Sequence, residues 1–192
     1  MNFKSKTMRH LQTVVKHRHY VNYFCRKAGI PWQGLTHDLS KFNPIEFCEG
    51  VKYYSGIMSP IDKCKQKQGY SDAWFHHRGR NKHHWEYWVD SLSKDGIPVE
   101  MPYRYAVEML CDWAGAGLAY TKFTNMKDAA RNEIGWWNQK KDHMKLAPNT
   151  RKFVETVFSL LKEYDYDYNL IFNEGVLKLV YAYATQMQTE EA

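Results

Sequence analysis

The chain has 192 residues, enough for one domain that buries a hydrophobic core without disulfides. Hydrophobic residues make up 44% and charged residues 25%, which excludes disordered, collagen-like and low-complexity chains. The net charge of +6 suits an anionic partner such as a phosphate ester, a nucleotide or nucleic acid. No apolar run approaches the ~20 residues of a membrane span, and the start MNFKSKTMRH is unlike a signal peptide, so we expect a cytoplasmic protein with no membrane partner.

The cysteines are far apart and form no Cys-x-x-Cys pair. A cysteine zinc site is therefore not expected, and neither is a disulfide framework in a chain of this length. We expect reduced thiols that are mostly buried as small hydrophobic side chains. The four are Cys25, Cys48, Cys64 and Cys111.

The first half of the chain predicts two helices and a loop. Residues 3–28 contain no Gly or Pro, and Gly29 and Pro31 then supply a stop. The Asn-Pro pair at 43–44 opens a second helix that runs to residue 54, because proline suits the first helical turn. Residues 55–69 contain Ser-Gly, Ser-Pro and a Lys/Gln cluster, which predicts a loop.

A third helical region is predicted from residue 71 to about Ser93, with a break at Gly79 left open. The turn-rich stretch 94–101 then connects to a fourth helix over 102–119. The small residues near the end of that helix, AGAG, would allow another helix to pack closely against it.

The last part of the chain predicts a fifth helix over 126–141 and a sixth that ends near residue 163, with Asn149 as its N-cap. Residues 165–175 stay undecided between helix and loop, and a final helix is predicted over 175–188. Alternating strand-like runs are nearly absent.

These elements predict an all-α bundle of about six to eight helices. We expect a single domain over residues 1–192, with its core at about 10–163 and a C-terminal extension over 164–192. Trp113 and Trp136 are most simply explained as core residues.

His17 lies on the apolar face of the first helix, at helical spacing from Val14 and Val21. His19 is two residues further on, about 200° around the helix. We therefore expect His17 to face the core and His19 to face away. Taken alone, His17 is equally typical of a structural core histidine.

Adjacent His37 and Asp38 can both reach one ion from their segment, THDLSKF. A neutral imidazole and a carboxylate are both good ligands for borderline divalent metals. A lone His-Asp pair is weak evidence, because chance supplies many. The histidines and acids elsewhere in the chain strengthen it.

Four histidines occur within nine residues in HHRGRNKHH, namely His76, His77, His83 and His84. Continuous helix would place His77, Asn81 and His84 on one face, whereas a break at Gly79 would let His83 replace His84. Which of the four are ligands therefore stays open. A basic, aromatic surface patch is the alternative interpretation.

Asp112 is embedded among Met, Leu, Cys, Trp and Ala in MLCDWA. A buried carboxylate is costly unless it is paired or bound to a metal. Glu108 lies one turn earlier and is expected to support it. The alternative is a partly exposed acid at a helix edge.

Together these residues give the order H…HD…H…H…D across four helices, which resembles the HD-domain superfamily of metal-dependent phosphohydrolases. The first motif of that superfamily often reads H-x-x-x-V, as His17 and Val21 do here. The stretch HDLSK is similar to the H-D-x-G-K of its cyclic-dinucleotide phosphodiesterase branch, with Ser40 in place of Gly. The Gly-Tyr-Pro loop of that branch is missing, so its substrate is not carried over. The chain also resembles an uncharacterised branch of the superfamily, known only as a domain of unknown function, over about residues 10–155. Three stretches carry this resemblance, namely WQGLTHDLSKF, HHRGRNKHHWEYW and MLCDW.

The resemblance implies an all-α HD-like fold with one or two divalent metal ions, of Mn, Fe, Co, Ni or Zn. One ion would be held by His17, His37, Asp38 and Asp112. A second would be held by His77 and by His84 or His83, with Asp38 bridging.

The activity implied is hydrolysis of a small-molecule phosphate ester, of which a nucleotide is one example. Lys41, Arg78 and Arg80 would bind the substrate phosphate. Asn81 would orient a ligand or donate to the substrate, which makes Asp38, Lys41 and Asn81 the expected catalytic residues.

Three alternatives remain open at this point. A diiron site on the same scaffold would permit oxygenase chemistry, since some members of the superfamily carry the same ligand set. A nucleic-acid-binding protein is suggested by RGRNKHHW, where cationic and aromatic residues alternate, although no recognised binding motif supports it. A degenerate HD fold with a structural role is the third.

Overall fold

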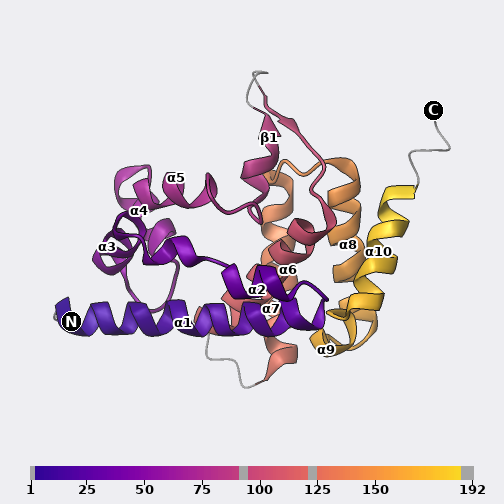
Figure 1. Cartoon of the computed structure of the whole chain (residues 1–192), viewed down its shortest axis with the longest axis horizontal. Coiled ribbons are helices and arrows are strands. Elements are labelled where there is room, and N and C mark those ends of the chain that lie inside the picture. The colour runs from indigo at the N-terminus through magenta and orange to yellow at the C-terminus, as the bar shows by residue number, and fades with distance from the viewer. Residues whose placement is uncertain (1–2, 91–94, 121–124, 187–192) are drawn as a thin grey trace.

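The computed structural model describes residues 3–90, 95–120 and 125–186 (Figure 1). Within them the regular structure is ten α-helices, three short 3-10 helices and one pair of two-residue strands, which confirms the all-α prediction. None of these described helices combines the length and the apolar character needed to cross a membrane.

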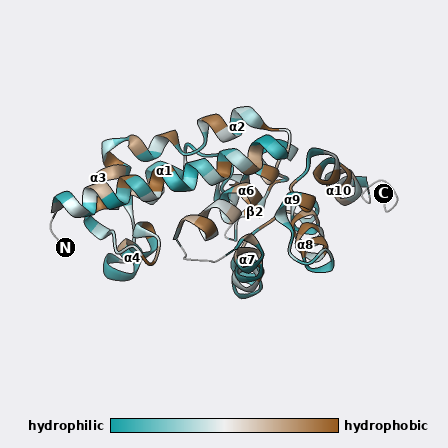
Figure 2. Ribbon diagram, turned by 90° about the horizontal axis from the view of Figure 1, so that it is seen from below, coloured by the Kyte–Doolittle hydropathy of each residue, from teal (hydrophilic) through white to brown (hydrophobic). Residues whose placement is uncertain are grey.

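Helix α1 (Phe3–Lys27) runs along one side of the molecule (Figure 1). The predicted apolar face is confirmed, because Val14, His17, Val21 and Phe24 are buried while His19 is exposed. Figure 2 shows the same pattern as hydrophilic and hydrophobic residues that alternate along α1.

Helix α2 (Pro31–Thr36), the 3-10 helix η1 (Leu39–Phe42) and α3 (Pro44–Tyr53) follow α1. Helix α2 packs closely on α1 at Gly34, where an added Cβ would lie 2.8 Å from the Cβ of Cys25. The predicted start of α3 is confirmed, since the Asn43 side chain accepts a hydrogen bond from the amide of Ile45.

The loop predicted over 55–69 is wrong, because α4 (Pro60–Gln68) occupies most of it. Proline at the first helical position and Gly69 with φ 87° after the last turn delimit this helix. Only Pro60 and Cys64 of α4 are buried, and hydrophilic residues cover much of its surface (Figure 2). An apolar face this narrow leaves no periodic signal in the sequence.

Of the two alternatives for the third helical region, the break at Gly79 is confirmed, because α5 (Asp72–Arg78) ends there. The chain continues through η2 (Trp85–Trp88) into β1 (Val89–Asp90), which pairs antiparallel with β2 (Ile97–Pro98). The predicted end at Ser93 lies outside the described residues. The break at Gly79 has a consequence for the site, since the chain turns there and brings both His83 and His84 inward.

Helices α6 (Tyr103–Tyr120) and α7 (Met126–Lys140) match the predicted fourth and fifth helices. The small residues of α6 do allow close packing, because an added Cβ on Gly115 would lie 2.5 Å from Cγ2 of Val21 on α1.

The 3-10 helix η3 (Lys141–His143) leads to α8 (Pro148–Glu163). The N-cap prediction at Asn149 is wrong, because α8 begins at Pro148 without a local side-chain cap. The Glu100 carboxylate accepts the amides of Asn149 and Thr150 instead, at 2.9 and 2.8 Å. This cap comes from 49 residues earlier in the chain, so local sequence does not reveal it.

Helices α9 (Tyr168–Ile171) and α10 (Glu174–Gln186) complete the described chain. Tyr168, Phe172 and Leu177 are fully buried in the same hydrophobic cluster as Phe24 of α1. The four cysteines are free thiols; Cys48 is exposed and the other three are buried.

Candidate metal centre

The turn after α2 sets the position of Asp38. Its backbone is in the left-handed region, with φ 55° and ψ 26°, which aspartate tolerates better than most residues. Arg18 of α1 fixes this turn, because its guanidinium donates to the carbonyl oxygens of His37 (2.8 Å) and Leu35 (3.0 Å). The turn therefore holds the His37 and Asp38 side chains in the interior, where both are buried.

The first group of ligand atoms joins α1, this turn and α6. His17 Nε2 lies 3.2 Å from His37 Nε2 and 3.0 Å from Asp112 Oδ1. Oδ2 of Asp38 lies 3.5 Å from each of the two imidazole Nε2 atoms. These four buried side chains each offer one ligand atom, all within 4.8 Å of one another.

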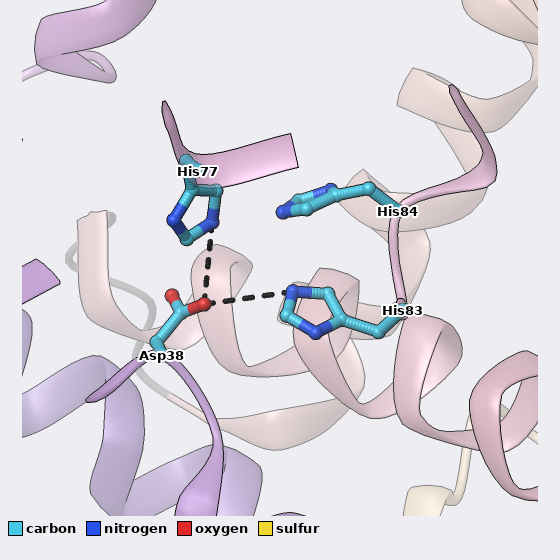
Figure 3. A group of neighbouring side chains, drawn as sticks. All are labelled: Asp38, His77, His83 and His84. Carbon is cyan, nitrogen blue, oxygen red and sulfur yellow. Dashed lines mark ion pairs between the residues drawn. The ribbon is translucent and has the colours of Figure 1, made fainter. Parts of the chain in front are cut away.

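The second group joins Asp38 to three histidines from α5 and the loop after it (Figure 3). Oδ1 of Asp38 lies 3.2 Å from His77 Nε2 and 3.5 Å from His83 Nε2. His84 points into the same space (Figure 3). Since Oδ2 belongs to the first group and Oδ1 to the second, the Asp38 carboxylate lies between the two.

Three buried ligand atoms of the second group make no hydrogen bond within the described part of the chain. They are Oδ1 of Asp38, Nε2 of His83 and Nε2 of His84. Asp38 Oδ1 and His83 Nε2 lie 3.5 Å apart as an ion pair, but buried polar atoms without a hydrogen bond are rare and costly, so each one needs an explanation. Coordination of a metal ion would satisfy all three at once. The buried groups are thus positioned to hold a metal ion.

Two further carboxylates orient the imidazole rings, and one of them, Glu108, forms a third group of candidate ligand atoms with His37 and His83. Oε1 of Glu108 lies 3.0 Å from Nδ1 of His37 and 3.2 Å from Nδ1 of His83. Oε2 of Glu46 lies 2.7 Å from Nδ1 of His77. A carboxylate on Nδ1 leaves the Nε2 lone pair free for a metal, as is usual for metal-bound histidine.

Sequence reasoning did not find this role for either carboxylate. Glu108 was expected to support Asp112 and orients His37 and His83 instead. Glu46 was not singled out at all, because a glutamate in the first turn of a helix is common and nothing local distinguishes it. Its other oxygen lies 2.6 Å from Nδ1 of His76, which belongs to none of the ligand groups.

The carboxylates and the imidazoles of the site differ in charge state. Burial lowers the pKa values of His17, His37 and His77, but the neighbouring carboxylates outweigh it and raise them, so metal binding would displace protons from these rings. Burial raises the pKa of the Asp38 carboxyl, but the attraction of His37 and Lys41 outweighs it and holds that pKa well below the usual range. Burial and the neighbouring His83 hold the pKa of His84 well below its usual value. Ionised carboxylate and neutral imidazole are the forms that bind metals.

A cavity of about 390 Å³ opens onto both ligand groups. Its floor is lined by five residues of the ligand groups, namely His17, Asp38, His77, His84 and Asp112. Its walls carry aromatic rings and two lysines, namely Trp74, Trp113, Tyr120, Trp136, Lys41 and Lys65. The assignment of Trp136 to the core is wrong, because it is 36% exposed, whereas Trp113 packs against the hydrophobic cluster as expected and also lines the cavity.

The remaining predicted residues lie in different places. Lys41 lines the cavity, with Nζ 3.3 Å from Oδ2 of Asp38. The guanidinium of Arg78 lies over the ring of Phe75, 5.0 Å from its centroid. Arg80 and Asn81 are absent from the lining of this cavity.

Asn81 contacts the ligand shell from the outside. Its amide donates to Oγ of Ser40 and to the carbonyl oxygen of His77, both at 2.8 Å. These bonds tie the chain after α5 to the turn that carries Asp38. The structure thus gives Asn81 a positioning contact with the site.

A family model described as "Family of unknown function (DUF5662)" matches residues 6–160. No curated protein and no solved structure matches the chain. The matched range contains every candidate metal ligand, from His17 to Asp112. The description assigns no activity, so a function has to be argued from the site.

Proposed function

The chain belongs to this family of unknown function, DUF5662, and we propose from the geometry of its own site that it is a metal-dependent phosphohydrolase with an HD-like centre. The observation that carries the proposal is the pair of buried His/Asp groups that share Asp38 at the floor of a cavity. The order of the ligands along the chain supports the HD-like assignment, since it follows H…HD…H…H…D.

One divalent ion would be held by the first group, namely His17, His37, Asp38 and Asp112. The other would be held by the second group, namely Asp38, His77, His83 and His84. Imidazole and carboxylate without thiolate favour Mn, Fe, Co, Ni or Zn. When bound, such ions lower the pKa of a coordinated water and neutralise charge on phosphoryl oxygens.

The chain itself supplies the groups that bind and orient the substrate. Lys41 places a cation at the cavity floor, beside Asp38, where it would contact a phosphate oxygen. Lys65 lies over the Trp74 ring, 4.3 Å from its centroid, and adds a second cation to the wall. The rings of Trp113 and Trp136 give the organic part of the ester an apolar surface and exclude water.

These features fit a small phosphate ester, of which a nucleotide is one example. Among the described lining residues five carboxylates face two lysines, so a phosphate group would bind here through bound metal with Lys41 beside it. The aromatic walls match a flat or apolar leaving group.

The test is hydrolysis of a panel of nucleotides and aryl phosphates by the purified protein, with added Mn²⁺, Co²⁺, Ni²⁺, Fe²⁺ or Zn²⁺. We expect metal-dependent release of phosphate or nucleoside, and loss of activity in Asp38→Ala because both ligand groups lose their shared carboxylate. His19→Ala is the matched control, since His19 is exposed on the opposite face of α1 and should leave activity unchanged. Activity that survives in metal-free Asp38→Ala protein would contradict the proposal.

A further inference from the structure

A second cavity of about 390 Å³ lies behind the metal-ligand groups. Its lining comes from α2, from the loop after α5 and from α6, and it shares no lining residue with the first cavity. His37 and His83 form the wall between the two. Their Nε2 atoms belong to the ligand groups, and their Nδ1 atoms face Glu108, which lines the second cavity. A ligand here would therefore contact the outer side of the centre.

The second cavity is strongly cationic. Arg80, Lys82 and Arg104 line it, and none of the three forms an ion pair within the described residues. Among the described lining residues Glu108 is the one acid, and its carboxylate is already engaged by His37 and His83. Three like charges around one polar cavity repel each other, and a bound anion would remove that repulsion.

Aromatic rings hold two of these cations in place. The Arg104 guanidinium lies 4.8 Å from the centroid of the Tyr105 ring, and Lys82 Nζ lies 5.8 Å from the same ring. A stacked guanidinium keeps its edge donors free for an oxyanion and loses less conformational entropy when it binds one. Trp32 adds an indole face at the cavity. This residue is 68% exposed, although tryptophan is highly buried on average.

We propose that this second cavity is a binding site for an oligophosphate anion, separate from the candidate metal centre. Two arginines and a lysine around one cavity match an anion with two or more phosphate groups, because each guanidinium can bind oxygens in a bidentate fashion. The amide of Gln33 and the hydroxyl of Thr36 supply further polar lining. The site does not depend on hydrolysis in the first cavity.

The test is isothermal titration calorimetry of the full chain with inorganic pyrophosphate at low ionic strength. The rear-site variant is Arg80→Gln/Arg104→Gln. The matched control is Arg9→Gln/Arg26→Gln, which removes the same charge from two exposed arginines of α1 that line neither cavity. Asp38→Ala removes the carboxylate shared by the two ligand groups. If the Asp38→Ala protein fails to fold, His84→Ala is used in its place.

We expect saturable binding to the wild type, the control and Asp38→Ala. The rear-site variant should bind at least about tenfold more weakly, since it loses two charge-assisted contacts to the anion. Three results would overturn the proposal: no saturable binding to the wild type, equal weakening in the control, or binding lost in Asp38→Ala and retained in the rear-site variant. The last result would place the anion in the first cavity.

Discussion

Asp38 is the residue on which the site depends, because its two carboxylate oxygens face different sets of imidazoles. Oδ2 lies among His17, His37 and Lys41, while Oδ1 faces His77 and His83. The left-handed backbone at this position directs the carboxylate inward, and a β-branched residue would be strained there. The adjacency of His and Asp in the sequence therefore has a structural reason.

Glu108 is expected to act on metal affinity without touching the metal. Glu108→Gln keeps the shape of the side chain but weakens the hydrogen bonds to Nδ1 of His37 and His83, so both rings become poorer ligands. We expect a 10- to 100-fold weaker metal affinity. Competition with a fluorescent chelator measures it, and Glu155→Gln on the exposed side of α8 is the control. Unchanged affinity in Glu108→Gln would remove this role.

Lys41 is expected to act on the substrate. Lys41→Met should lower kcat/KM by roughly 10- to 100-fold, because a charge-assisted contact to phosphate is lost. Metal content should stay at the wild-type level, since Lys41 offers no ligand atom to either group. Lys67→Met, on the exposed face of α4, should behave as wild type. A loss of metal in Lys41→Met would show that the lysine has a structural role.

The residues of the candidate ligand groups could be singled out from the sequence because their types are rare in apolar surroundings. His17 interrupts an apolar face, and Asp112 interrupts an apolar run. The carboxylates that contact the histidine Nδ1 atoms could not be predicted. Glu46 and Glu108 look like ordinary helical glutamates until the positions of the rings that they contact are known. The residues of the cavity wall were missed for the same reason, since a buried tryptophan and a cavity tryptophan have the same sequence signal.

At the scale of elements, the packing of α6 on α1 brings His17 and Asp112 together. Gly115 is central to it, because the α1 backbone passes close to the site of its absent side chain: an added Cβ would lie 3.2 Å from the Val21 amide nitrogen as well as 2.5 Å from Cγ2. The helices would have to separate to admit a methyl group. The close approach of α1 and α6 therefore depends on a residue three positions from a candidate ligand.

Gly115→Ala should destabilise the fold by about 1–3 kcal/mol, the usual range for overpacking. Gly135→Ala is the matched control in α7, where an added Cβ meets nothing within 4 Å. There the same substitution should stabilise the fold by up to about 1 kcal/mol, because alanine favours helix over glycine. Urea denaturation of the two variants measures the difference. Equal effects would mean that the α1–α6 contact is looser than the structure shows.

The helices with a broad apolar face were predicted correctly, and those without one were not. Helix α1 has a continuous buried face and was found, whereas α4 buries only Pro60 and Cys64 and was taken for a loop. The segment after Gly79 stayed undecided, because its histidines and tryptophans fit a helical period by chance while Gly79 allowed a break. The conformation of the segment after Gly79 is set by contacts outside regular helix, including the hydrogen bond that Nε1 of Trp88 donates to the Lys82 carbonyl oxygen.

At the scale of the whole molecule, the site lies where two groups of helices meet along α1. Helices α3, α4 and α5 gather beside its N-terminal half, and α8, α9 and α10 beside the other end (Figure 1). The first group contributes His77 through α5, and α6 contributes Asp112. We therefore expect bound metal to stabilise the fold, since it would link the first group to α1 and α6.

A buried carboxyl outside the ligand groups should make the stability depend on pH. Burial raises the pKa of Glu133 to about 8, and Tyr168 donates a hydrogen bond to it. Because the folded pKa lies above the ordinary value of 4.5, the folded chain binds this proton more tightly. The free energy of unfolding should therefore fall as pH rises from about 4.5 to about 8, by up to ~1.4 kcal/mol per unit.

Glu133→Gln removes this titration while it keeps an acceptor for Tyr168. Urea denaturation of both proteins at pH 5, 6, 7 and 8 gives the difference in stability, from which contributions common to both, such as the histidines, cancel. We expect the variant to gain stability relative to the wild type as the pH rises. A difference that stays constant over this range would mean that Glu133 does not titrate in it.

The most direct measurement is metal content, determined by elemental mass spectrometry on untagged wild-type protein reconstituted with Mn²⁺, Fe²⁺, Co²⁺, Ni²⁺ or Zn²⁺. Two groups that share Asp38 predict two equivalents in the wild type, about one in His84→Ala and none in Asp38→Ala. His19→Ala should keep both. A wild type that holds no metal after reconstitution, or an Asp38→Ala variant that keeps its full complement, would contradict a metal centre built on Asp38.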